Sequence, residues 1–321
     1  MPTPLETWAK QIRAGETRAV SRAITSIENH EPEADALLKQ LFYSTGKASM
    51  IGVTGAPGTG KSTLVDRLAA TYRHAGKSVG VIAVDPTSPF TGGAILGDRI
   101  RMQGHASDEG VFVRSMATRG FLGGLARATA DVALLLDAAG KEIILIETVG
   151  VGQDEVDIVR LADCTLVLLV PGLGDDVQNM KAGLMEIADI FVINKADREG
   201  ADRVEQQVHA MLALVPERDG WKPAVARTVA TESKGIHELA AEIENFLKRA
   251  ESSPEFQKRE TDHWRRRLIE MIEGKLMERV LGAPESEKRL AELAKEVAAR
   301  KTDPFAAADE VLKQSKLLPV R

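Results

Sequence analysis

The stretch Gly55-Ala56-Pro57-Gly58-Thr59-Gly60-Lys61-Ser62 fits the pattern G-x-x-x-x-G-K-[ST] of phosphate-binding loops. It follows the apolar run Met50–Val53 and precedes a helical stretch, Ser62–His74. In this context, glycines let backbone N–H groups turn inward around phosphates, and the helix N-terminus adds its positive dipole end. The pattern predicts that Lys61 reaches the β- and γ-phosphates and that Ser62 offers a hydroxyl to Mg²⁺. The predicted phosphate-binding residues are Gly55, Ala56, Pro57, Gly58, Thr59, Gly60, Lys61, Ser62 and Thr63.

Short apolar runs alternate with helical segments on both sides of this loop. Most positions in each run carry an apolar side chain, which is typical of strands buried on both faces of a parallel sheet. The runs are Met50–Val53, Val79–Val84, Ile143–Ile146, Thr165–Val170, Ile190–Ile193 and Ala224–Val229. We therefore predict an α/β fold of the P-loop NTPase type, with a mostly parallel sheet and helices on both faces. The spacing after the P-loop helix allows a right-handed crossover to a parallel neighbour, Val79–Val84.

Two acidic residues end predicted strands, where a parallel sheet binds its ligands. Asp85 directly follows Val79–Val84 and can hold Mg²⁺ through water, although a turn aspartate before a proline is the alternative. Glu147 follows Ile143–Ile146, with Gly150 three residues further on. We interpret this as a Walker-B and switch element, in which Glu147 acts on Mg²⁺ or its water and the Gly150 N–H senses the γ-phosphate.

A base-reading motif, Asn194-Lys195-Ala196-Asp197, follows the run Ile190–Ile193. In the pattern [NT]-K-x-D a carboxylate accepts the N1 and N2 donors of guanine, which adenine does not offer. We therefore assign base recognition to Asp197, loop support to Asn194 and cover of the base to Lys195. The segment Val229-Ala230-Thr231 resembles the loop whose backbone N–H meets guanine O6, so Ala230 and Thr231 are further nucleotide-binding candidates; an ordinary loop is the alternative.

The residues predicted to act in GTP hydrolysis are Lys61, Glu147, Gly150 and Gln153. Val151 stands directly after the glycine, where many GTPases have a water-positioning glutamine, and Gln153 lies two positions further on. We therefore predict a GTPase with a slow intrinsic rate.

Composition narrows the functional class. The 321 residues carry a net charge of −5 and 4% aromatic side chains, which argue against nucleic-acid binding. A single cysteine excludes a disulfide framework, and no apolar stretch approaches the roughly 20 residues of a membrane helix. No signal peptide is visible, so the expected location is cytoplasmic.

Three zones divide the chain: an N-terminal helical extension at 1–45, a nucleotide-binding domain at 46–250 and C-terminal helices at 251–321. The C-terminal zone has apolar residues at helical spacing, but too few of them to form a good hydrophobic core alone. A dimerisation arm is favoured over packing back on the central domain.

Taken together, these motifs resemble the MeaB/ArgK/MMAA family of GTPases, which are chaperones of adenosylcobalamin-dependent methylmalonyl-CoA mutase. The resemblance is carried by Gly55–Ser62, Asp85–Pro89 with Thr91–Gly93, Gly97–Met102, Glu147–Gln153, Gly174–Gln178 and Asn194–Asp197.

The resemblance implies three switch segments. Asp85 and Asp98 would be first-switch carboxylates near Mg²⁺, which makes Ser62, Asp85, Asp98 and Glu147 the expected metal site. The second switch would be Glu147–Gln153. Asp175, Gln178 and Lys181 would lie in a third switch that couples nucleotide state to the mutase; a flexible strand-to-helix loop is the alternative.

The implied function is gating. GTP binding and hydrolysis would control adenosylcobalamin loading onto the mutase and protect it, with a homodimer formed through the C-terminal arm and adenosylcobalamin held only by the partner. A metabolic kinase is one alternative, but it would favour ATP, against Asn194–Asp197. A metal-insertion GTPase is another, but it would show clustered Cys and His, which the sequence lacks.

Overall fold

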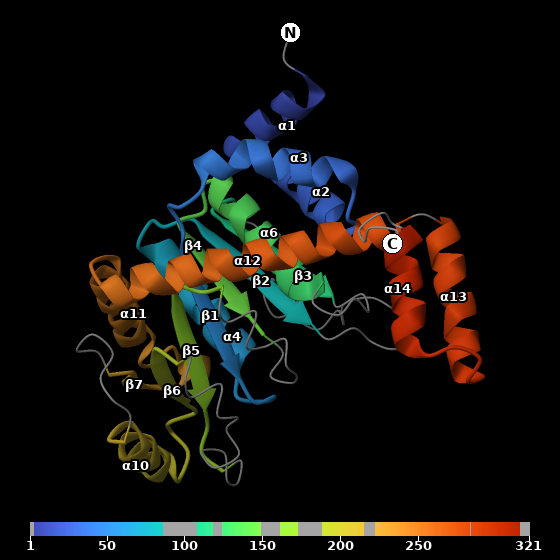
Figure 1. Cartoon of the computed structure of the whole chain (residues 1–321). Coiled ribbons are helices and arrows are strands. Elements are labelled where there is room, and N and C mark those ends of the chain that lie inside the picture. The colour runs from blue at the N-terminus through green and yellow to red at the C-terminus, as the bar shows by residue number, and fades with distance from the viewer. Residues whose placement is uncertain are drawn as a thin grey trace. The chain divides into compact units, whose positions relative to one another are not determined.

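A computed structural model describes residues 3–85, 108–117, 124–148, 161–172, 188–214, 222–282 and 284–314 (Figure 1). The chain divides into two compact units, Met1–Glu255 and Phe256–Arg321. Within the described residues, no helix is long and apolar enough to cross a membrane.

The described residues of the first unit form a seven-stranded parallel sheet with the order β3-β2-β4-β1-β5-β6-β7. This confirms the predicted α/β fold of the P-loop type. The strands are β1 (Ser49–Gly55), β2 (Val79–Asp85), β3 (Val111–Ala117), β4 (Ile143–Glu147), β5 (Cys164–Leu169), β6 (Ile190–Asn194) and β7 (Ala224–Thr228). Strand β2 is parallel to β1, but the prediction that it is the neighbour of β1 is wrong, because β4 lies between them. The glutamate-bearing strand is therefore the direct neighbour of the phosphate loop strand.

Strand β3 is the one strand of this sheet that the sequence analysis did not predict. It lies at the edge, pairs with β2 alone among the described strands, and is mostly half-buried. An edge strand keeps polar residues such as Arg114 and Ser115, so it lacks the continuous apolar run used to recognise central strands.

Helices cover both faces of the sheet (Figure 1). The helices of the first unit are α1 (Pro4–Arg13), α2 (Thr17–Glu28), α3 (Pro32–Leu41), α4 (Lys61–His74), α6 (Gly124–Ala138), α10 (Ala201–Leu212) and α11 (Ile236–Glu251). Helix α6 packs on Ile144 and Ile146, and α10 packs on Val167 and Leu169. The strand register puts these side chains on one face of the sheet, so α4 and α11, which contact each other, lie on the opposite face.

The N-terminal helices are integrated into the first unit. Buried residues of α1, α2 and α3 share one hydrophobic core with α6 and with strands β2, β3 and β4. Arg114 on β3 forms an ion pair with Glu28 on α2. Near the start of β1, the Asp137 carboxylate accepts hydrogen bonds from the backbone N–H groups of Gly46 and Ala48, at 2.5 and 3.1 Å. These contacts hold the helices directly against the strands that lead to the nucleotide site.

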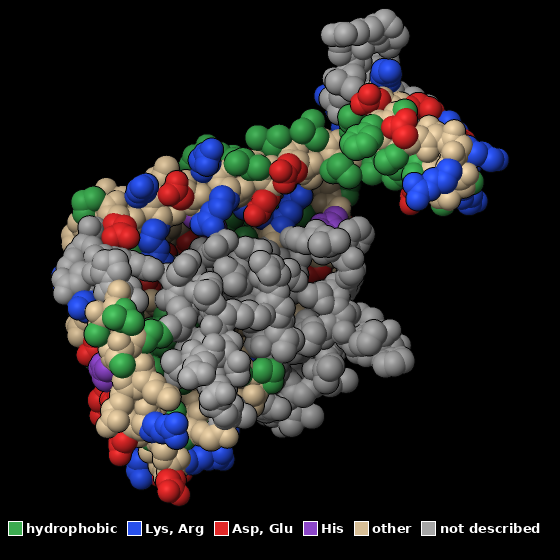
Figure 2. All heavy atoms as spheres, turned by 60° about the horizontal axis from the view of Figure 1, so that its bottom comes forward, with side chains coloured by type: hydrophobic (Ala, Val, Ile, Leu, Met, Phe, Trp, Pro, Cys, Tyr) green, Lys and Arg blue, Asp and Glu red, His purple; other side chains and the backbone are tan. Residues whose placement is uncertain are grey.

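The second unit is helical. It contains α12 (Pro254–Leu281), which begins just before the unit boundary, α13 (Pro284–Ala298) and α14 (Pro304–Gln314). A small core joins Val280, Leu293, Ala307 and Val311. Figure 2 shows apolar side chains exposed between charged ones along α12. The exposed apolar residues of α12 are Leu268, Ile269, Ile272, Leu276 and Met277.

Candidate nucleotide-binding site

The phosphate loop joins the end of β1 to the start of α4 and requires glycine at two close contacts. At Gly55, a Cβ atom would lie 2.5 Å from the Leu168 carbonyl oxygen of β5. At Gly60, φ is +93° and a Cβ would lie 2.6 Å from Asn194 Nδ2. Only glycine, which has no Cβ, can combine a positive φ with such a close contact. The two glycines therefore allow β5 and Asn194 to lie close to the phosphate loop.

Lys61 is held within the phosphate loop. Its Nζ donates hydrogen bonds to the carbonyl oxygens of Gly55 (2.7 Å) and Ala56 (3.1 Å). The Thr59 hydroxyl also donates to Ala56 O, at 2.8 Å. Lys61 is 6% exposed. An ammonium group can only donate hydrogen bonds, so the two carbonyl oxygens hold it in position at the loop.

Ser62 and Glu147 meet where α4 begins and β4 ends. The Ser62 hydroxyl donates a 2.6 Å hydrogen bond to Glu147 Oε1, and both side chains are buried. Ile144 and Ile146 face α6, so alternation along β4 directs Glu147 toward the α4 face. A hydroxyl and a carboxylate are hard oxygen donors of the kind that Mg²⁺ binds, so these two residues fit a magnesium site.

Asn194, at the end of β6, connects the phosphate loop to the segment after β7. Its Nδ2 donates to Thr59 O at 2.8 Å. Its Oδ1 accepts from the Thr228 hydroxyl (3.1 Å) and from the Ala230 N–H (3.2 Å). A buried amide bonded on both ends fixes the relative positions of the loops that it joins.

Lys195 and Asp197 continue from Asn194. Lys195 adopts a positive φ of +55°, and its Nζ donates to the Gly58 carbonyl at 2.7 Å. The Lys195 side chain therefore passes along the phosphate loop. Asp197 is exposed.

The segment after β7 is closed by an antiparallel bridge between Val229 and Lys234. Between them, Ala230–Glu232 forms a 3₁₀ turn. Lys234 pairs with Glu232 at 2.7 Å; this hydrogen bond, with a smaller contribution from the Asp197 charge, raises the pKa of Lys234. Asp197 and this segment therefore act on each other electrostatically.

The structure brings together the phosphate loop, Glu147, Asn194, Lys195 and Ala230. Thr231 is exposed in the same 3₁₀ turn as Ala230. Asp85 ends β2, but its side chain lies outside the described residues. Further predicted residues also lie outside them, namely Asp98, Gly150, Gln153, Asp175, Gln178 and Lys181.

Sequence reasoning missed Thr228, whose hydroxyl binds Asn194. The available signal was its place at the end of β7, directly before the predicted guanine loop. Across the described ranges, no group of three or more His, Cys, Asp or Glu side chains could hold a metal ion.

A phosphate loop on a parallel sheet, bonded through Asn194 to the segment after β7, fits the class of P-loop GTPases. Within this class, the model of the family described as methylmalonyl Co-A mutase-associated GTPase MeaB matches residues 20–285, and the chain belongs to this family. The predicted family is thus confirmed, and the chain is a GTPase.

Relatives and a solved structure match nearly the whole chain. A putative GTPase of Pyrococcus horikoshii is 48% identical over 97% of this chain and 98% of its own. The mitochondrial methylmalonic aciduria type A homolog of Caenorhabditis elegans is 30% identical over 95% of this chain and 81% of its own. The crystal structure of a LAO/AO transport system kinase has a TM-score of 0.71, with 26% identity, and covers 98% of this chain and 99% of its own.

Proposed function

We propose that this GTPase is a chaperone of methylmalonyl-CoA mutase, or of a related cobalamin-dependent acyl-CoA mutase. It would gate adenosylcobalamin loading and protect the mutase, while adenosylcobalamin stays with that partner. The family description and the Caenorhabditis elegans relative support the partner. The observation that carries the GTPase part of the proposal is the contact of Asn194 with both the phosphate loop and the segment after β7, which supports a site that binds phosphate and base together.

The proposed cofactors are GTP or GDP and Mg²⁺, with Ser62, Asp85, Asp98 and Glu147 as the magnesium site. The contact between the Ser62 hydroxyl and the Glu147 carboxylate supports this assignment. When bound, Mg²⁺ supplies positive charge that neutralises the phosphate oxygens.

The chain's own residues would bind and orient GTP. Lys61 would exchange its carbonyl acceptors for the β- and γ-phosphates, and Asp197 would accept the guanine N–H donors. Gly150 would sense the γ-phosphate, and Gln153 would orient the attacking water. The intrinsic rate of GTP hydrolysis would be slow. The change between the GTP-bound and GDP-bound states would then be transmitted to the mutase by Asp175, Gln178 and Lys181.

We further propose a homodimer formed through the second unit. The exposed apolar residues Leu268, Ile272 and Leu276 recur at intervals of four on α12, which puts them on one helix face. A second copy of the same helix would cover this face. A cytoplasmic location is proposed because the sequence holds a single cysteine, Cys164, which cannot form a disulfide within the chain.

The decisive experiment measures GTP hydrolysis by the full chain with and without purified methylmalonyl-CoA mutase. We expect complex formation and faster hydrolysis when the mutase is present. Absence of both binding and stimulation would refute the partner.

A matched variant separates the partner assignment from the guanine site. Asp197→Asn should weaken GTP and favour xanthosine triphosphate, because the amide no longer offers two acceptors to guanine. The mutase should then stimulate hydrolysis of xanthosine triphosphate by this variant. Unaltered base preference would contradict the role of Asp197, whatever the mutase does.

A further inference from the structure

Arg227 connects the last strand of the sheet to the helix that follows the base-reading motif. Its Nε donates to Glu205 Oε2 at 3.0 Å, and its Nη2 donates to Asp202 Oδ1 at 2.7 Å and also to Glu205 Oε2. Arg227 lies on β7, whereas the two carboxylates lie on the first two turns of α10. A guanidinium bound to two carboxylates restrains both the position and the orientation of the helix, which a single contact does not.

Alternation along β7 directs Arg227 toward α10. Val225 and Arg227 are two positions apart, so they lie on the same face of the sheet. Val225 packs against the hydrophobic cluster that α10 forms with β5 and β6. The register pairs Arg227 with Ile193, the residue directly before Asn194. Arg227 therefore contacts α10 at the end of the strand where the base-reading motif begins.

The base-reading loop, residues 195–200, connects β6 to α10 and contains Asp197. Near the start of the loop, the Ala196 N–H donates to the Thr228 carbonyl at 3.1 Å. At the end of the loop, α10 is held by Arg227, the residue directly before Thr228. Two consecutive residues of β7 therefore restrain both ends of the base-reading loop.

Of the two elements that Arg227 connects, the start of α10 is the less restrained. Its N-cap is Gly200, which offers no side chain to the free N–H groups of the first turn. The side chains of α10 in the hydrophobic cluster come from Val204 onward. Strand β7 pairs with β6, and a Cβ on Gly235 would lie 2.1 Å from the Arg227 carbonyl oxygen, so its backbone is closely packed. Loss of the Arg227 side chain should therefore loosen the start of α10 and not the strand.

We propose that Arg227 is a positioning residue for guanine recognition, which restrains the start of α10 and thereby holds the base-reading loop in the conformation in which Asp197 binds the base. The inference rests on the proposed role of Asp197, and its test needs no mutase. A carboxylate that accepts both N–H donors of guanine must keep one orientation, whereas a single hydrogen bond tolerates a less fixed loop. A looser loop should therefore weaken a two-point contact more than a one-point contact.

Inosine diphosphate distinguishes the two kinds of contact, because its base keeps the N1 donor of guanine but lacks the N2 amino group. The full-length wild-type chain should bind GDP about tenfold or more tightly than inosine diphosphate, since one hydrogen bond to a charged group is lost. In Arg227→Gln, this preference should fall about three- to fivefold. The affinity for inorganic tripolyphosphate, measured by competition, should change less than about twofold, because the phosphate loop shares no partner with Arg227.

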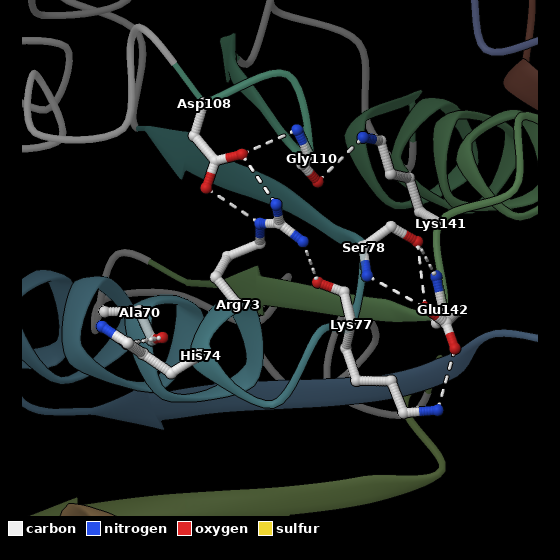
Figure 3. A network of polar contacts seen from close by, with 9 residues as sticks. All are labelled: Ala70, Arg73, His74, Lys77, Ser78, Asp108, Gly110, Lys141 and Glu142. Carbon is white, nitrogen blue, oxygen red and sulfur yellow. Dashed lines mark hydrogen bonds and ion pairs between the residues drawn. The ribbon is translucent and has the colours of Figure 1, made fainter.

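The matched control is Arg73→Gln, which breaks a comparable arginine contact at the opposite end of α4 from the phosphate loop (Figure 3). Arg73 binds Asp108 through two hydrogen bonds of 2.9 Å, Nε to Oδ2 and Nη2 to Oδ1. This variant should keep the wild-type preference for GDP over inosine diphosphate. Affinities are measured calorimetrically, below the unfolding temperature of every variant.

Two further variants separate the restraint from the charge of Arg227. The double variant of Arg227→Gln and Glu205→Gln removes one charge of each sign, so its net charge equals that of wild type. It should lose as much of the preference as Arg227→Gln, because both break the same contact. Arg227→Lys should recover part of the preference, since it keeps the charge but not the planar fork.

Asp197→Ala separates this inference from the assignment of the base reader. If Asp197→Ala abolishes the preference while Arg227→Gln keeps it, the positioning role of Arg227 is wrong and the guanine site stands. If Asp197→Ala keeps the preference, the role of Asp197 is wrong and the inference fails with it. A preference restored in the double variant would assign the effect to charge, and an equal loss in Arg73→Gln would assign it to general destabilisation. Either result would overturn the proposal.

Discussion

The Ser62 hydroxyl and the Glu147 carboxylate are hydrogen-bonded at 2.6 Å, although 85 residues separate them. Ser62 is the second residue of the phosphate-loop helix, and Glu147 ends the strand beside the phosphate-loop strand. A glutamate at this position reaches the serine directly. The contact aligns two oxygen donors for the proposed metal ion before a nucleotide binds.

Ser62→Ala should remove the Mg²⁺ dependence of GDP affinity. The wild-type chain should bind GDP about tenfold or more tightly with Mg²⁺ than with EDTA, because the metal ion neutralises the charge of the phosphate oxygens. Calorimetric titration in the two buffers measures the difference. Ser62→Thr keeps the hydroxyl and is the control. An equal Mg²⁺ effect in Ser62→Ala would contradict the assignment.

Lys61→Ala should reduce GTP hydrolysis by about 10²-fold or more, because the ammonium is the positioned donor of the phosphate loop. Single-turnover hydrolysis measures the loss. Lys47→Ala is a suitable control, because Lys47 is exposed and precedes β1. Unchanged hydrolysis in Lys61→Ala would refute the role of this lysine.

Asn194→Ala should weaken GDP binding by about five- to 150-fold, the range expected when buried hydrogen bonds worth about 1–3 kcal/mol are lost. Thr228→Val removes only the hydroxyl contact to Asn194 and should have a smaller effect. Fluorescent GDP displacement gives both affinities. If Thr228→Val proved as harmful as Asn194→Ala, the contacts to Thr59 and Ala230 would contribute nothing.

The contribution of Glu142 to stability should depend on pH. The Lys77 ammonium, at 2.8 Å, and the Ser78 N–H lower the pKa of Glu142 below its ordinary value of 4.5. A lowered folded-state pKa contributes stability above the unfolded value, and that contribution is lost as pH falls through the folded-state pKa. The pair is half exposed and screened by solvent, so the contribution should be small.

Urea unfolding of wild type and Glu142→Gln between pH 3 and 7 tests this expectation. The difference in unfolding free energy should be constant above pH 4.5 and shrink below it. A difference that grew toward low pH would have the wrong sign.

The sequence predicted the central strands and the edge strand β7, but not the other edge strand, β3. Strands β1, β4 and β6 are buried on both faces, so their apolar runs stand out. Strand β3 keeps polar residues at the edge and was missed. Local pattern did not predict the strand order either, because an apolar run shows that a strand is buried but not which strand pairs with it; β4, not β2, lies next to β1.

The sequence by itself determined the phosphate loop, the guanine motif and the GTPase class, because each motif acts through neighbouring residues whose spacing sets their geometry. Tertiary structure alone decided which of these pieces touch. Asn194 bonds Thr59 across 135 residues, and Arg73 bonds Asp108 across 35. Such contacts form only when strand order and helix packing bring distant segments together, and periodicity along the chain carries no information about them.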